Sequence, residues 1–79
     1  MIFVLTGHAE QRRIERGLSL DFIAEAFDNP DVVAENPRGN GVIYTKTFDL
    51  AGLFREVRLV VDDTVTPNRI VTIFVGDRS

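Results

Sequence analysis

The sequence predicts an α+β domain with a short N-terminal strand, followed by two helices that pack on a curved four-stranded antiparallel sheet. Its 79 residues suffice for one domain and are too few for two. Capping residues followed by helical segments occur before Pro30, whereas segments rich in β-branched residues fill the rest of the chain. The connections between those later segments are too short for crossover helices, so we expect hairpins.

Capping residues delimit the two predicted helices. A short apolar strand over residues 2–5 comes first, and it could pair across a dimer. Thr6 and Ser19 can each accept a backbone N–H from the first turn of a helix. Gly17 is placed to end the first helix in the left-handed conformation, and Asn29-Pro30 stops the second.

The two helices differ in how much apolar surface they offer. The second has an apolar stripe at helical spacing, made of Leu20, Ile23, Ala24 and Phe27. The first, over residues 7–16, offers only Ala9 and Ile14 for packing. A helix this polar in a small domain needs another reason to sit where it does.

From residue 31 onward the pattern is that of strands. They are expected at residues 31–36, where the pattern is weak, and at 42–48, 54–62 and 69–75. Turn-forming residues at 37–41 and 51–52, and a loop containing Pro67, separate them. The tail from Gly76 is expected to fray.

The last two strands each have an apolar face and a mixed face. Val57, Leu59 and Val61 alternate with Glu56, Arg58, Val60 and Asp62, and Val71, Ile73 and Val75 alternate with Ile70, Thr72 and Phe74. If the apolar faces lie under the helices, the mixed faces form a second surface, to which the neighbouring strand would add Tyr44 and Lys46. Such a surface suits phosphate contacts and base stacking, although a one-sided antiparallel sheet always has a polar face.

The first helix has a row of basic side chains. His8, Arg12 and Arg16 are spaced i, i+4, i+8 and fall within roughly 80° of one another, so they can line one groove. The alternative is a solvated face with weak surface ion pairs. Arg12 could also pair with a carboxylate such as Asp62 or Glu56 and pin the helix to the sheet.

Composition excludes several classes of protein. The net charge of −3 argues against a protein that coats nucleic acid non-specifically. The absence of cysteine rules out disulfides and thiolate metal sites, and a single histidine with no suggestive carboxylate spacing predicts no metal site. No apolar run approaches the roughly 18 residues of a membrane helix, and the start lacks the features of a secretory signal. We therefore expect a cytoplasmic protein.

The opening Thr6-Gly-His8-Ala, followed by Arg12 and by Arg16-Gly-Leu-Ser19, resembles that of a bacterial and phage family, the domain-of-unknown-function 4258 family. The resemblance continues in the strands, at Arg58-Leu-Val-Val-Asp62 and at Thr72. This family looks related to the fold group of barnase, EndoU, colicin-type and RelE-like toxins. The resemblance implies one RelE/barnase-like domain over residues 1–79, metal-independent RNA cleavage and no cofactor.

Carried over by position, the resemblance makes His8, Arg12, Arg58 and Thr72 the catalytic candidates. His8 would carry a proton, the two arginines would clamp phosphate oxygens, and Thr72 would donate a hydrogen bond to one. The second proton carrier is left open among Glu56, Tyr44 and Lys46. The candidates for substrate binding are Arg16, which also suits a helix end, together with Tyr44, Lys46 and Phe74.

The expected partners are RNA, a cognate antitoxin or immunity protein, and a second copy of the chain. The alternative function is a non-catalytic protein-interaction module with a degenerate toxin fold.

Overall fold

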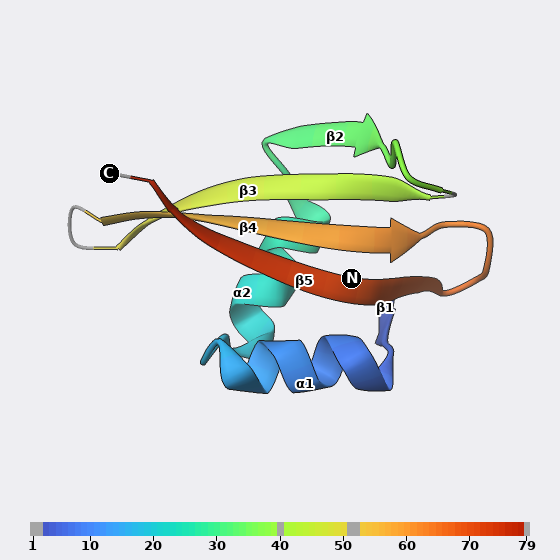
Figure 1. Ribbon diagram of the computed structural model, residues 1–79, viewed down its shortest axis with the longest axis horizontal. Coiled ribbons are helices and arrows are strands. Elements are labelled where there is room, and N and C mark those ends of the chain that lie inside the picture. The colour runs from blue at the N-terminus through green and yellow to red at the C-terminus, as the bar shows by residue number, and fades with distance from the viewer. Residues whose placement is uncertain (1–2, 40, 51–52, 79) are drawn as a thin grey trace.

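The computed structural model describes residues 3–39, 41–50 and 53–78. Seven elements follow one another along the chain (Figure 1): β1 (Phe3–Leu5), α1 (Gly7–Glu15), α2 (Leu20–Asp28), β2 (Val32–Glu35), β3 (Val42–Leu50), β4 (Leu53–Asp62) and β5 (Asn68–Arg78). The α+β class and the order of the elements are as predicted. The last strand includes residues 76–78, so the expectation of a fraying tail from Gly76 is wrong for those residues.

The strands form one five-stranded mixed sheet in the order β1-β5-β4-β3-β2. The antiparallel pairs β2–β3, β3–β4 and β4–β5 agree with the sequence prediction. The N-terminal strand was expected, but its place in the sheet was not: β1 pairs in parallel with β5, with Phe3 opposite Asn68 and Leu5 opposite Ile70. Two parallel strands must be joined by a long crossover connection. Here α1, α2 and β2–β4 lie between β1 and β5 in the chain and form that connection. Residues 3–5 therefore complete the chain's own sheet.

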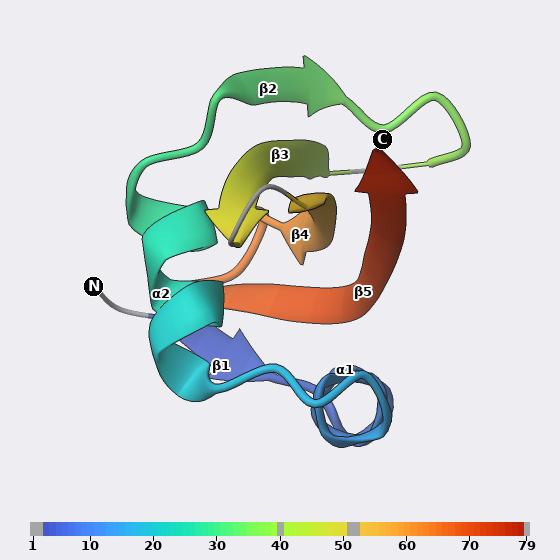
Figure 2. The ribbon, with the colours of Figure 1, turned by 90° about the vertical axis from the view of Figure 1, so that its left-hand side faces the viewer.

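Both helices pack on the same side of this sheet. Figure 2 shows α2 against one side of the curved sheet and α1 beside β1 and β5. The core is formed by apolar side chains of β4, β5, the two helices and the turn between those helices: Val57, Leu59, Val61, Ile70, Ile73, Ala9, Ile23, Ala26 and, in the turn, Leu18. The expected apolar face of β4 is confirmed. We call the sheet face opposite this core the open face.

A β-bulge in β5 changes the expected alternation of that strand. Val60 pairs with Thr72, but its neighbour Val61 pairs with Ile70, so Val71 is an extra residue. The bulge turns Ile70 into the core and leaves Val71 39% exposed, which reverses the faces predicted for these two residues. The extra residue reverses which side chains face the core on one side of the bulge and leaves the alternation on the other side unchanged.

Thr6 fastens the start of α1 to this bulge. Its hydroxyl accepts the backbone N–H of Ala9 at 3.2 Å, which confirms the predicted cap, and donates to the carbonyl of Val71 at 3.0 Å. Its backbone N–H donates to the carbonyl of Ile70 at 3.1 Å. Thr6 thus provides hydrogen-bond partners for one N–H group in the first turn of α1 and for two carbonyl groups of β5 at the bulge.

We predict that Thr6→Val destabilises the protein, because valine has the shape of threonine but can neither accept nor donate these side-chain bonds. The expected loss in the free energy of unfolding is about 1–3 kcal/mol. Urea denaturation of Thr6→Val and Thr6→Ser measures it. Serine keeps the hydroxyl, so equal losses in the two variants would contradict this role.

Arg13, rather than an apolar side chain, fixes the end of α1. Ile14 is 63% exposed and Leu20 is also exposed, so neither packs as the sequence suggested. Arg13 instead donates to both carboxylate oxygens of Glu10 and, at 2.9 Å, to the carbonyl of Leu18. Together with Gly17, whose φ of 67° confirms the predicted helix stop, it shapes the turn into α2.

Candidate functional site

Two rows of side chains cross the open face of the sheet. Strand register places Thr45, Arg58 and Phe74 in one row across β3, β4 and β5. The next row contains Ile43, Val60 and Thr72. Arg58, Thr72 and Phe74 therefore share one face, as strand alternation predicted. Phe74 is 54% exposed, so its ring is accessible on this face.

Tyr44 and Lys46 lie on the other face, so placing them beside Arg58 is wrong. Tyr44 pairs with Leu59 and Lys46 with Val57, two residues of the core. The Tyr44 ring packs 5.4 Å from that of Phe27. The ammonium of Lys46 lies 3.6 Å from a carboxylate oxygen of Asp31. A shift of one residue in register exchanges the faces of a whole strand, and the sequence did not fix the register of β3 against β4.

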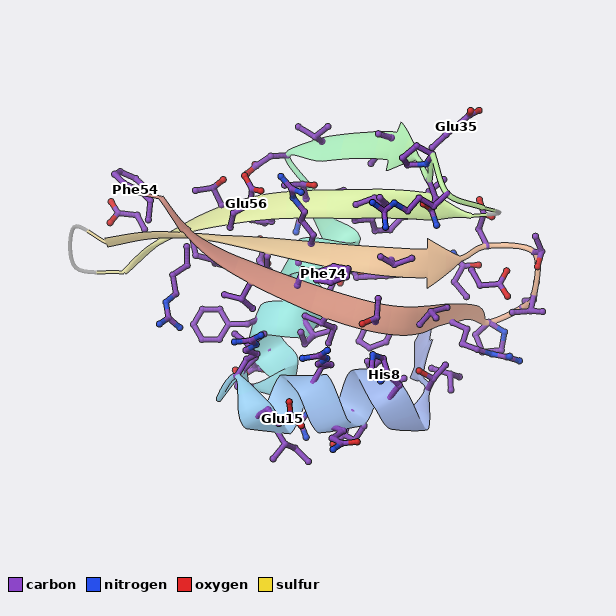
Figure 3. The ribbon with its side chains drawn as sticks, viewed as in Figure 1. His8, Glu15, Glu35, Phe54, Glu56 and Phe74 are labelled. Atoms are coloured by element: carbon purple, nitrogen blue, oxygen red, sulfur yellow. The ribbon has the colours of Figure 1, made fainter. Side chains whose placement is uncertain are left out.

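Glu56 and Arg58 form an ion pair on the open face. They are two residues apart on β4, so their side chains point to the same side, and Nε of Arg58 donates to Oε1 of Glu56 at 2.7 Å. The Glu56 side chain is 14% exposed and that of Arg58 is 58% exposed. Strand register pairs Phe74 of β5 with Arg58 and pairs Glu56 with Gly76, and Figure 3 labels Glu56 and Phe74.

This ion pair lies in a hollow of about 290 Å³ that is bounded by β4 and by Phe74, Val75 and Gly76 of β5. Three groups were candidates for the second proton carrier, and two of them face the helices. Glu56 is the one that lies on the open face.

A larger hollow of about 490 Å³ adjoins the first and shares Arg58 and Phe74 with it. Thr72 lines it as well, and the segment Asn36-Pro37-Arg38, between β2 and β3, forms its far wall. The sequence predicted a turn at this segment but no part in a site. Only the β2–β3 hairpin brings it over the open face, and no local pattern indicates that.

His8 and Arg12 line a separate hollow of about 220 Å³, together with Gln11 and Glu15 of the same helix. Arg12 lies 3.8 Å from the carboxylate of Glu15. The partners proposed for it, Asp62 and Glu56, accept hydrogen bonds from Thr64 and Arg58.

Figure 3 shows His8 at the edge of α1 nearest β5. Arg16 is exposed and is the C-cap of α1, its backbone N–H donating to the carbonyl of Arg12. The structure thus brings Arg58 and Thr72 together, and it places His8 and Arg12 in a different hollow.

Three carboxylates have lowered pKa values, each because of hydrogen bonds that favour the charged form. The hydrogen bond from Arg13 lowers the pKa of Glu10. The backbone N–H of Thr47, and then Lys46, lower the pKa of Asp31. The hydroxyl and N–H of Thr64 lower the pKa of Asp62. All three stabilise turns and strand ends and lie outside the two open-face hollows.

These shifts predict that the protein loses stability in acid. A carboxyl group whose pKa is lower in the folded state stabilises the fold above its unfolded pKa of about 4, and this contribution is lost as pH falls through the folded value. We expect the urea midpoint to fall between about pH 5 and pH 2. Asp31→Asn, which retains an oxygen for the N–H of Thr47, should reduce that slope. An unchanged slope in this variant would contradict the assignment.

Among the described residues, no group of three or more His, Cys, Asp and Glu side chains is placed to hold a metal ion. Neither described helix has the length and apolar character that crossing a membrane requires.

Comparison with known proteins gives one match. Residues 5–75 match the family model described as "Domain of unknown function (DUF4258)". No curated protein and no solved structure matches the chain. The matched range includes Thr6, all candidate side chains and, except for Gly76, the residues that line both open-face hollows.

Proposed function

The chain belongs to the domain-of-unknown-function family DUF4258, and we propose that it binds RNA on the open face of its sheet and cleaves it without a metal ion. The observation that supports this most is the Glu56–Arg58 pair in a hollow beside an exposed Phe74. A carboxylate, a guanidinium and an aromatic ring are the groups that proton abstraction, phosphate binding and base stacking require.

In the proposed reaction, Glu56 takes the proton of a ribose 2′-hydroxyl, and that oxygen attacks the adjacent phosphorus. Arg58 donates to the non-bridging oxygens, where negative charge develops in the transition state, and Thr72 donates to a further phosphate oxygen. The bond from phosphorus to the 5′-oxygen breaks, and a water molecule protonates the leaving oxygen, because His8 lines a separate hollow on α1. The products are a 2′,3′-cyclic phosphate and a 5′-hydroxyl.

The cations of α1 have a secondary role in this proposal. Arg12 and Arg16 attract the strand as it leaves the sheet toward α1, where electrostatic contacts contribute affinity without sequence preference.

A cleavage assay in the presence of EDTA tests the proposal. Wild-type protein is incubated with mixed single-stranded RNA, and the ends of the products are identified. We predict cyclic phosphate ends, a loss of about 10²-fold or more in Arg58→Ala, and near-normal cleavage by Arg69→Ala. Arg69 is an exposed arginine of β5 that lies outside both hollows, so it controls for the lost charge. Failure of the folded wild type to cleave would overturn cleavage, and equal losses in both variants would overturn the role of Arg58.

One observation favours the alternative, a non-catalytic module that binds a protein such as an antitoxin. β2 is the last strand of the sheet, and both Val32 and Val33 are exposed on it. An extended segment of a partner can pair with such an edge. Growth arrest on expression, relieved by Arg58→Ala, would favour the ribonuclease. Unaffected growth together with a partner whose binding is lost in Val33→Lys would favour the module.

A further inference from the structure

The larger hollow of the open face has an apolar floor and an aromatic edge. Ile43 and Val60 are register partners on β3 and β4 and form the floor, and Pro37 closes it from the loop side. Phe74 stands at the boundary with the smaller hollow. The volume of about 490 Å³ is within the range of small-molecule binding sites. A flat apolar ring can enter this hollow and stack on Phe74.

The rim of the same hollow is cationic. Arg38, from the loop between β2 and β3, and Arg58, from β4, both line it, and none of its lining residues in the described part of the chain is acidic. Within those described residues, Arg58 makes one side-chain hydrogen bond, through Nε, which leaves its terminal N–H groups for an anion. This hollow differs from the smaller one, in which Glu56 adds a negative charge.

Asn36 holds the loop wall in place. Its carboxamide oxygen accepts the backbone N–H of Arg38 at 3.1 Å, and its own backbone N–H donates to the carbonyl of Gly41 at 3.1 Å. Its carbonyl accepts the N–H of Gly39 at 3.4 Å. These bonds fix the backbone that carries Arg38 before a ligand arrives, which lowers the entropic cost of binding.

We propose that this larger hollow binds one unpaired nucleotide of the substrate, with its base stacked on Phe74 and its phosphate between Arg38 and Arg58. The inference rests on the proposed function, because it places that nucleotide next to the phosphodiester bond held at Glu56 and Arg58. Phe74 and Arg58 are cross-strand partners, so the ring and the guanidinium are neighbours on one face.

The occupant is single-stranded. Stacking on a protein ring requires a base with a free face, and the bases of a duplex are stacked on each other. The apolar floor offers few hydrogen-bond partners for a base edge, so we expect a preference for bases that stack strongly rather than for one sequence.

Binding of a non-cleavable probe tests the subsite separately from cleavage. The probe is a fluorescein-labelled six-nucleotide 2′-O-methyl RNA, which lacks the attacking hydroxyl group, and anisotropy gives its Kd. Loss of one stacked base corresponds to about 5- to 150-fold weaker binding. We expect this loss for an abasic probe with the same phosphates, for a duplex probe, and for Phe74→Ala. Phe54→Ala, an exposed phenylalanine of β4 outside both hollows, is the matched control and should bind normally.

The salt dependence separates the base contact from the phosphate contact. Arg38→Ala should reduce the slope of log Kd against log salt by about 0.7, the value for one phosphate of a single strand, and Phe74→Ala should leave it unchanged. Equal binding of the abasic and complete probes, equal effects of Phe74→Ala and Phe54→Ala, or no binding at all would overturn the subsite. Base-dependent binding by a protein that cleaves no RNA would support the subsite and overturn the proposed cleavage.

Discussion

Gly41→Ala is expected to lower the free energy of unfolding by about 2–6 kcal/mol, the combined effect of backbone strain and overpacking. A Cβ atom at this position would lie 2.2 Å from the carbonyl oxygen of Val61, and this is a backbone atom that cannot rotate away. The φ of Gly41 is 97°, a conformation that L-residues rarely adopt. A domain of this size has a total stability of about 4–12 kcal/mol, so a large part of it would be lost.

Gly39→Ala is the matched control, since it makes the same change two residues away in the same turn. A Cβ atom at Gly39 would meet nothing within 4 Å. We expect its urea midpoint to stay near that of the wild type or to rise slightly, because alanine has fewer unfolded conformations. Equal destabilisation by the two substitutions would contradict this explanation. It would mean that the close approach of Gly41 to Val61 of β4 is not the reason why position 41 needs glycine.

The sequence predicted the parts of this fold that depend on near neighbours. Thr6 and Ser19 cap the helices, Gly17 ends α1 with a positive φ, and α2 stops at Asp28, before Asn29. Each of these outcomes depends on hydrogen bonds or steric limits within about one helical turn, which sequence spacing describes well. The same is true of the apolar face of β4.

The errors arose where a residue's environment depends on distant parts of the chain. At the bulge, the carbonyl of Val71 accepts a hydrogen bond from Thr6, which lies 65 positions earlier in the chain. The side of the sheet that Tyr44 faces depends on the register of β3 against β4. The parallel pairing of β1 with β5 joins the two ends of the chain. Alternation within one strand contains no information about any of these pairings.

The same division holds for the candidate site: the sequence predicted the contacts within one element but not the contacts between distant elements. Arg58, Thr72 and Phe74 came from alternation within β4 and β5, and the structure places them together. Arg38 was missed because only the hairpin brings its loop over the open face. His8 and Arg12 came from helical spacing, which gives their common face on α1 but not the distance from that face to the sheet.

Glu56→Gln is expected to reduce RNA cleavage by about 10²- to 10⁴-fold while RNA binding stays intact, if Glu56 is the general base. Glutamine has the same shape, and its carboxamide oxygen can still accept the Nε–H of Arg58, so the pair on the open face keeps its geometry. The amide cannot take the proton of a 2′-hydroxyl. Initial cleavage rates, with Kd measured on the 2′-O-methyl probe, separate the loss of chemistry from a loss of binding.

Glu35→Gln provides the charge-matched control, since Glu35 is an exposed carboxylate of β2 (Figure 3) and lines neither hollow. It should cleave RNA at the wild-type rate. His8→Ala, compared with Gln11→Ala from the same α1 hollow, tests in the same assay whether His8 takes part in the reaction. We expect both substitutions to leave the cleavage rate near that of the wild type, because this hollow is separate from the one that contains Glu56 and Arg58. A loss of about 10²-fold or more in His8→Ala alone would instead mean that His8 donates the proton to the leaving oxygen.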